Sequence, residues 1–301
     1  TIEITKKELE NEYVVDQIIY KVTDEQGNDI TEKRSNDIKV YLNEDGNIYA
    51  EVKNYQFDLK LLKRIVEVNG EKQKERLLNI DTSKLNTVDE NGKLVTTAEY
   101  KMIKDPVWVK NGDIVKYTFR IFNEGYIDGY AKEITEDIPE GLEFLYSDKT
   151  EEELKNDKTL TDAEKEAIIF NKSMLWEYSN KDKKTISTKY LSKENEKEDG
   201  EFLIKAFGKN DGKKTAKDLD YKEVSVMFKV TAPNTLDEII RNEAEISDDS
   251  DKDGSSVNDR DSSPEKWGKE NDDKYYDDDK KWPIYKEDDE HYDNIKLTYF
   301  D

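Results

Sequence analysis

The feature that most constrains the fold is the arrangement of apolar residues in short runs, where apolar and polar residues alternate. This period of two places apolar side chains on one face of a strand and does not fit the 3.6-residue period of a helix. Turn-forming residues such as Asn111-Gly112-Asp113 and Asp128-Gly129 separate many of the runs. The pattern therefore predicts an all-β fold, with strands at 14–22, 38–42, 47–53, 57–68, 98–109, 114–122, 130–138, 142–146, 185–191, 201–207, 221–231 and 238–246.

One stretch, at about 150–170, departs from this alternation. Thr150 with Glu153, and Thr161 with Glu164, have the spacing of capping boxes, in which a threonine and a glutamate satisfy the free amides that begin a helix. The stretch is predicted to form one or two short helices inserted between strands.

The counts of cysteine and histidine and the net charge exclude several functional classes. The chain has no cysteine and a single histidine, His291, so disulfides, thiol catalysis, Ser-His-Asp triads and multi-histidine metal sites are ruled out. A net charge of -23 disfavours binding to nucleic acid or to anionic membranes. No apolar run reaches the ~20 residues of a membrane span, so we expect no direct membrane insertion. With 72 acidic residues, any carboxylate pair is expected by chance and does not by itself indicate an enzyme.

The chain is expected to have three parts. Residues 1–56 form a small β segment or the end of a preceding domain, and 57–247 form the main β domain. Residues 248–301 are rich in acidic side chains, which is typical of a solvated linker. Residues 297–301 resemble 54–58, so the linker is expected to run into the first strand of a second repeat within a longer protein.

Three polar residues fall on otherwise apolar strand faces. Side chains alternate between the two faces of a strand, so residues two apart share a face. On this basis Lys63 shares a face with leucines and isoleucines in 57–68. Glu136 lies between Ile134 and Ile138 on its face, and Asn242 lies between Ile240 and Ala244. Each has an ordinary explanation: a lysine near a sheet edge, a carboxyl at a strand end, and an amide that satisfies buried backbone.

Together the three residues also support a chemical reaction. Burial lowers a lysine pKa and raises a carboxyl pKa, so a neutral Lys63 amine could attack the Asn242 carbonyl while a protonated Glu136 polarises it. Ammonia would leave, and an amide would link Lys63 to Asn242. The reaction is single-turnover, so the chain is not expected to be an enzyme in the ordinary sense.

Five blocks in order resemble the isopeptide-forming, immunoglobulin-like repeats of Gram-positive, especially clostridial, surface and fimbrial proteins. They lie at residues 57–65, 105–107 with 112–117, 123–131, 138–144 and 242–246. The resemblance implies a collagen-adhesin-like β-sandwich, tandem repeats of the same protein as neighbours, and an extracellular, wall-anchored or fimbrial location. It also implies that Lys63 and Asn242 hold the crosslinking positions.

The assisting acid has alternatives. The family block often carries an aspartate near the position of Glu136, so Asp137 is an alternative, although parity favours Glu136. Asp58 is close to Lys63 in sequence but faces the other way, and Glu124 and Asp113 are weaker candidates.

A run of aspartates follows the last expected strand. Asp249, Asp251 and Asp253 alternate before Gly254, which is how calcium loops begin, and Asp259 and Asp261 could add further oxygens. The EF-hand pattern is incomplete, because Arg260 occupies the twelfth position. Calcium is the cofactor that this run predicts, and a solvated acidic loop is the alternative.

Two functional hypotheses follow. The first is a structural stalk repeat of a surface adhesin or fimbria, stabilised by the Lys63–Asn242 crosslink. The second is a module that binds a host matrix protein or a glycan through Trp108, Tyr126, Tyr130 or the helical insertion.

Overall fold

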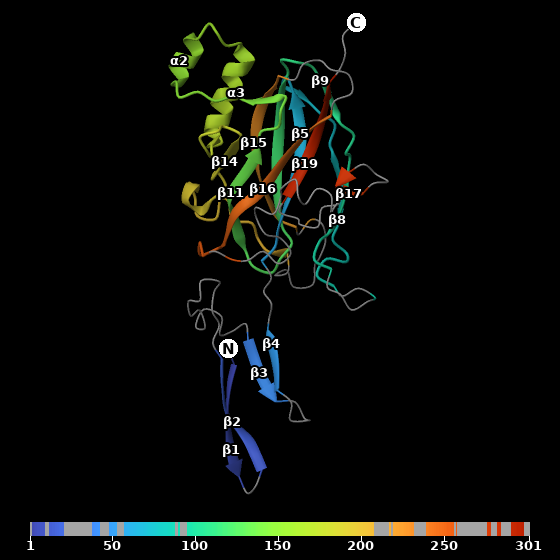
Figure 1. Cartoon of the computed structure of the whole chain (residues 1–301), viewed down its shortest axis with the longest axis vertical. Helices are drawn as coiled ribbons and strands as arrows, with labels where there is room; N and C mark the ends of the chain where they lie inside the picture. The colour runs from blue at the N-terminus through green and yellow to red at the C-terminus, as the bar shows by residue number, and fades with distance from the viewer. Residues whose placement is uncertain are drawn as a thin grey trace. The chain divides into compact units, whose positions relative to one another are not determined.

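The computed structural model describes residues 2–9, 12–20, 38–42, 48–52, 57–87, 90, 95–207, 217, 219–231, 239–255, 257, 276–277, 282–283 and 290–297 (Figure 1). The chain divides into two compact units, residues 1–55 and residues 56–301. In the first unit, β1 (Ile2–Leu9) pairs antiparallel with β2 (Glu12–Tyr20), and β3 (Ile38–Leu42) pairs antiparallel with β4 (Ile48–Val52).

The described part of the second unit contains two large sheets. The first has the spatial order β12 (Leu142–Phe144), β15 (Tyr221–Val230), β10 (Ile114–Asn123), β5 (Leu59–Val68) and β6 (Glu71–Lys72). The second has the order β13 (Glu177–Tyr178), β14 (Thr185–Thr188), β11 (Gly129–Asp137), β16 (Ile239–Asp251), β19 (Glu290–Leu297) and β9 (Val107–Val109). Two small hairpins are β7 (Leu77–Asp81) with β8 (Glu99–Met102), and β17 (Tyr276–Asp277) with β18 (Trp282–Pro283).

The two large sheets pack face to face over one apolar core. The alternating side chains of β5, β10 and β15 meet those of β11, β16 and β19 in a single buried cluster. In β16, for example, Ile240, Asn242, Ala244 and Ile246 are buried, while Arg241, Glu243 and Glu245 between them are partly exposed. This is the burial pattern that a period of two dictates when one face of each sheet is covered. The prediction of an all-β fold is confirmed.

The helical insertion is also confirmed. The helices α2 (Glu151–Asn156) and α3 (Asp162–Ser173) begin at Thr150 and Thr161, and both capping boxes are formed. The fully buried Asn171 fixes α3 to β15: its side chain accepts from Met227 N at 2.8 Å and donates to Met227 O at 2.9 Å. This amide thereby replaces a neighbouring strand at that point. A short 3-10 helix, η1 (Lys193–Asn195), follows β14. No helix in the described ranges is long and apolar enough to cross a membrane.

Two expected strands were wrong in detail. The run 98–109 is split into β8 and β9, which join different sheets, because Pro106 lacks the amide hydrogen that a continuous ladder requires. The run 201–207 is not a strand: Ile204 forms only an isolated bridge with Gly129, in which the two residues exchange hydrogen bonds of 2.8 and 3.1 Å.

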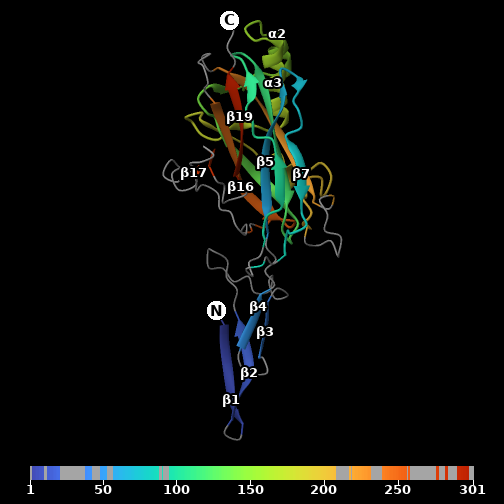
Figure 2. The ribbon, with the colours of Figure 1, turned by 90° about the vertical axis from the view of Figure 1, so that its right-hand side faces the viewer.

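The acidic segment contains regular structure that the sequence analysis did not predict. β16 continues to Asp251, where we expected the strand to end at 246, and Lys132 Nζ offsets the added charge by pairing with Asp248 Oδ2 at 2.5 Å. Farther along, β19 occupies a place inside the second sheet, between β16 and β9. It also lies beside β5 of the first sheet, as two perpendicular views show (Figures 1 and 2). A linker was therefore the wrong description of residues 290–297.

Candidate functional site

Lys63 lies at the middle of β5, directly opposite Phe119 of β10. Its side chain is fully buried and shares the core face with Leu61 and Ile65. The ammonium nitrogen lies 4.7 Å from the ring centre of Tyr117 and 5.3 Å from that of Phe119. Lys63 therefore does not reach water at a sheet edge, which was the ordinary explanation for a lysine at this position.

Glu136 and Asn242 come from neighbouring strands of the facing sheet. Glu136 on β11 pairs with Ala244 on β16, so Asn242, two residues before Ala244, is its diagonal neighbour on the same face. Glu136 is 1% exposed and Asn242 is fully buried. Because both side chains point into the core and Lys63 points toward them from the other sheet, the three groups meet between the sheets.

One carboxylate oxygen joins the three residues. Lys63 Nζ lies 2.9 Å from Glu136 Oε1, and Asn242 Nδ2 donates to the same oxygen at 2.6 Å. Glu136 Oε1 thereby holds the polar ends of both Lys63 and Asn242, which is the positioning that a reaction between neighbouring groups requires. The structure thus brings together Lys63, Glu136 and Asn242.

Burial controls the charges of this trio. Desolvation lowers the pKa of Lys63, although the nearby Glu136 opposes the shift. Desolvation raises the pKa of Glu136, and Lys63 opposes that shift. Both directions favour the neutral amine and the neutral acid over the ion pair. Burial also raises the pKa of Tyr117 well above its usual value, so its hydroxyl stays protonated.

The orientation of the Asn242 amide differs from the expected one. We expected a protonated Glu136 to donate to the amide oxygen, whereas the structure directs Nδ2 at Glu136. Glu136 Oε2 and Asn242 Oδ1 are both buried without a hydrogen-bond partner among the described residues. A half-turn of the amide would place its oxygen at the short distance typical of an O–H···O bond from a protonated carboxyl.

The alternative acids lie elsewhere. Asp137 is exposed and accepts from Thr185 Oγ1 at 3.0 Å. Asp58 is buried just before β5, and its parity directs it away from the core face that carries Lys63. Glu124 Oε1 accepts from Tyr100 and from the amide of Ala98, both at 2.8 Å. Asp113 holds a turn by accepting from Asn69 and from the amide of Lys110.

A second buried ionic group adjoins the trio and was missed by the sequence analysis. Asp293 on β19 and Arg76, just before β7, are 2% and 6% exposed and form a two-point ion pair. Asp293 is directly opposite Asn242 in the β16–β19 ladder. Side-chain alternation could not have found it, because residues 290–297 follow a strongly acidic stretch and were assigned with it to a linker.

The expected calcium loop is only partly described. Asp249 and Asp251 belong to β16, and Asp253 lies in the turn that follows. Asp251 Oδ1 accepts from the amides of Asp253 and Ser255, each at 2.9 Å, so it stabilises the turn. Asp259 and Asp261 lie outside the described residues. Within the described ranges, no group of three or more acidic or histidine side chains is placed to hold a metal ion.

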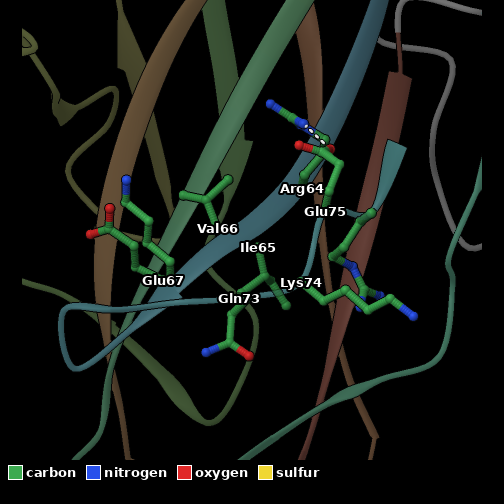
Figure 3. A pocket seen from close by; sticks show the side chains of 9 residues that line it. Arg64, Ile65, Val66, Glu67, Gln73, Lys74 and Glu75 are labelled. Atoms are coloured by element: carbon green, nitrogen blue, oxygen red, sulfur yellow. Dashed lines mark hydrogen bonds and ion pairs between the residues drawn. The ribbon is translucent and has the colours of Figure 1, made fainter. Parts of the chain in front are cut away.

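A surface pocket adjoins β5, the strand that carries Lys63. It is lined by residues 64–67 of β5 and by residues 72–76, and Arg64 pairs with Glu75 at 2.6 Å within it (Figure 3). Lys63, Glu136 and Asn242 are not among its lining residues. The pocket is therefore separate from the trio, which is enclosed in the core. An enclosed trio is suited to a reaction between its own members.

Comparison with models of protein families finds no match for the chain, and comparison with curated proteins finds no significant similarity.

Proposed function

We propose that this chain contains a self-crosslinking, load-bearing repeat in which Lys63 and Asn242 form an intramolecular isopeptide bond with the help of Glu136. The observation that carries the proposal is the shared contact: Lys63 Nζ and Asn242 Nδ2 both lie within hydrogen-bond distance of Glu136 Oε1 in a fully buried site. A buried lysine, acid and amide are costly to retain as mere packing, because each must be desolvated.

The reaction balances without any further reagent. The neutral Lys63 amine attacks the side-chain carbonyl carbon of Asn242, and a new C–N bond forms. Glu136 donates a proton toward the amide and takes one from the attacking nitrogen as the tetrahedral intermediate forms. The bond from that carbon to Nδ2 then breaks, and Nδ2 leaves with the transferred proton as ammonia. Glu136 ends in the protonation state in which it began.

The crosslink would join the two sheets. Lys63 belongs to the first sheet and Asn242 to the second, so the bond would connect β5 with β16 through the core. We had expected Asn242 on the last strand of the unit, but β19 follows β16 in the same sheet. For a closed loop of well over 100 residues, the loop-entropy argument used for disulfides gives about 5 kcal/mol of stabilisation. A chain with no cysteine cannot obtain this stabilisation from disulfides.

The two packed sheets also support the finer description of the domain as an immunoglobulin-like β-sandwich. With the resemblance of five sequence blocks, this leads us to propose a stalk repeat of a Gram-positive surface adhesin or fimbrial protein, placed outside the cell beside tandem copies of itself.

The intact mass of the denatured protein tests the crosslink. We expect the wild-type mass to be one ammonia below the sequence mass, and the masses of Lys63→Ala and Asn242→Ala to equal their sequence masses. Lys60→Ala is the matched control: Lys60 lies on the same strand but is partly exposed, so this variant should still lose ammonia. A wild-type mass equal to the sequence mass would overturn the proposal.

One observation favours a binding role as a second candidate. Trp108 on β9 is 58% exposed, and Lys296 Nζ lies 5.0 Å from the centre of its ring. An exposed tryptophan is a reasonable contact for a host protein or glycan. Tyr130, named for the same role, is 2% exposed and belongs to the core. Loss of binding in Trp108→Ala, in a screen of matrix proteins and glycans, would support this role.

A further inference from the structure

The strand that carries Lys63 is irregular beside the site. On β10, the adjacent residues Lys116 and Tyr117 pair with Glu67 and Ile65, so Val66 is the extra residue of a β-bulge. Bulges bend a strand and change the direction of nearby side chains. Val66 lies three residues after Lys63, so the bulge distorts the strand close to the residue that carries the amine.

Asp293 holds the strand beside this bulge. From β19, Asp293 Oδ2 accepts from the backbone amide of Ile65 at 2.9 Å. The backbone of Asp293 lies directly opposite Asn242 in the ladder between β19 and β16. Asp293 therefore connects the strand of the amine to the strand of the amide: its backbone lies beside Asn242 in the second sheet, and its side chain reaches Ile65 in the first.

Arg76 neutralises Asp293 and fixes its orientation. Arg76 Nε lies 2.7 Å from Asp293 Oδ2, and Arg76 Nη2 donates to Asp293 Oδ1 at 2.8 Å. Arg76 Nη2 also donates to the carbonyl of Asp105 at 2.6 Å. A two-point contact of this kind fixes both side chains, and it places a positive charge beside a carboxylate that lies near the reacting amine.

We propose that Asp293, held by Arg76, is a positioning residue for the crosslinking reaction: it anchors the bulged backbone of β5 at Ile65 and thereby holds Lys63 against Asn242. This inference rests on the proposed function. It also implies an order of events, because the bond can form at its full rate only after β19 has entered the second sheet.

The charged groups that face Lys63 give this role a distinctive pH signature. Glu136 on β11 contacts the amine, and Glu243, on the partly exposed face of β16, and Asp293 on β19 also act on Lys63 through their charges. Arg76 contacts Asp293, and Lys104, whose pKa burial lowers to about 7, is influenced by both of them. The negative charge of Asp293 favours the protonated form of Lys63, so its removal should allow the amine to react at lower pH.

The test follows ammonia loss over time in the full chain. The chain is made by cell-free synthesis, moved to buffers between about pH 5 and pH 9, and sampled for intact mass. Asp293→Ala removes the acceptor for the Ile65 amide, and a small misplacement of a reacting group can slow a reaction by about 10- to 100-fold. Asp293→Asn keeps an acceptor for that amide, so we expect a smaller loss of rate and a pH profile displaced toward lower pH.

Asp248→Asn serves as the matched control, because Asp248 forms an ion pair on β16 but its side chain is 43% exposed. It should react at the wild-type rate and with the wild-type pH profile. Circular dichroism identifies the variants that fold; if Asp293→Ala does not, the rate and pH profile of Asp293→Asn decide.

Variants of Asp293 that fold and react with the wild-type rate and profile would overturn the inference, since a merely structural residue would lower the melting temperature without moving either. If the wild-type chain loses no ammonia, the proposed function itself fails, which is a separate and recognisable result.

Discussion

Lys63 Nζ and Glu136 Oε1 lie 2.9 Å apart, in side chains that are both fully enclosed between two β-sheets. Desolvation acts on the two residues in opposite senses, lowering the pKa of the amine and raising that of the acid. Both shifts favour the neutral amine and the neutral acid, and burial of both groups distinguishes this pair from the surface ion pairs of the same domain.

Glu136→Gln should abolish the loss of ammonia. The glutamine has nearly the same shape but cannot exchange a proton with the attacking amine, so Lys63 and Asn242 would remain separate. The measurement is the intact mass after denaturation. Asp137→Asn is the control at the neighbouring, exposed position and should crosslink fully; a crosslinked Glu136→Gln protein would assign the acid role to another residue.

Removing one member of the pair should give stability profiles with opposite pH dependence. In Lys63→Met, Glu136 stays buried and its pKa in the folded protein stays raised. Its contribution to the free energy of unfolding is therefore fully present below its pKa in the unfolded chain, about 4.3, and is lost as the pH rises through its pKa in the folded protein.

In Glu136→Gln, Lys63 stays buried and its pKa in the folded protein stays lowered. The free energy of unfolding is therefore reduced below that pKa and recovers as the pH rises toward the pKa of lysine in the unfolded chain, about 10.4. Urea unfolding across this range measures both slopes, with Lys63→Met/Glu136→Gln as the reference. Slopes of the same sign would contradict the assignment of the two buried groups.

Asn171→Ala should destabilise the attachment of the helical insertion. The side chain of Asn171 makes three hydrogen bonds, to Leu145 O, Met227 O and Met227 N. Unpaired buried groups cost about 1–3 kcal/mol each, so we expect a loss of about 2–4 kcal/mol in urea unfolding. Asn156→Ala, which removes one exposed bond to Glu152 O, should change stability little. The crosslink should still form in both variants.

Calcium should stabilise the chain if the aspartate run binds it, as the sequence pattern predicts. Added calcium would then raise the melting temperature, and excess chelator would reverse the effect. Asp249→Asn/Asp253→Asn should weaken the response, because carboxylates are the ligands that calcium prefers. A melting temperature that is independent of calcium would leave the run with only its observed role, in which Asp251 stabilises the turn after β16.

The sequence could place each member of the trio on its strand face. Strand side chains alternate strictly, so Lys63, Glu136 and Asn242 were assigned to buried faces from their apolar neighbours alone, and all three are buried. The capping boxes of α2 and α3 could also be predicted from the sequence, because each is formed by residues three apart in the chain. In each case a few adjacent residues determine the outcome.

Other features depend on partners far away in the chain. The strand β19 was mistaken for linker because its burial follows from β16, β9 and β5 and not from its own composition. The run 201–207 alternates like a strand, but within the described part of the chain it pairs only through the bridge between Ile204 and Gly129. Asp293 could not be recognised as a positioning residue from the sequence, because that proposed role depends on its contacts with Ile65 and Arg76.

The sequence alone determined the chemistry that this protein has available: no thiol, one histidine, an all-β pattern, and a lysine, an acid and an amide on apolar faces. The tertiary structure decided which of these groups meet. Lys63 and Asn242 lie in different sheets and are far apart in the chain, so only the packing of the two sheets brings them to one oxygen of Glu136. Alternation along a strand is a local property of the backbone, whereas contact across a core depends on how the sheets pair, bulge and stack.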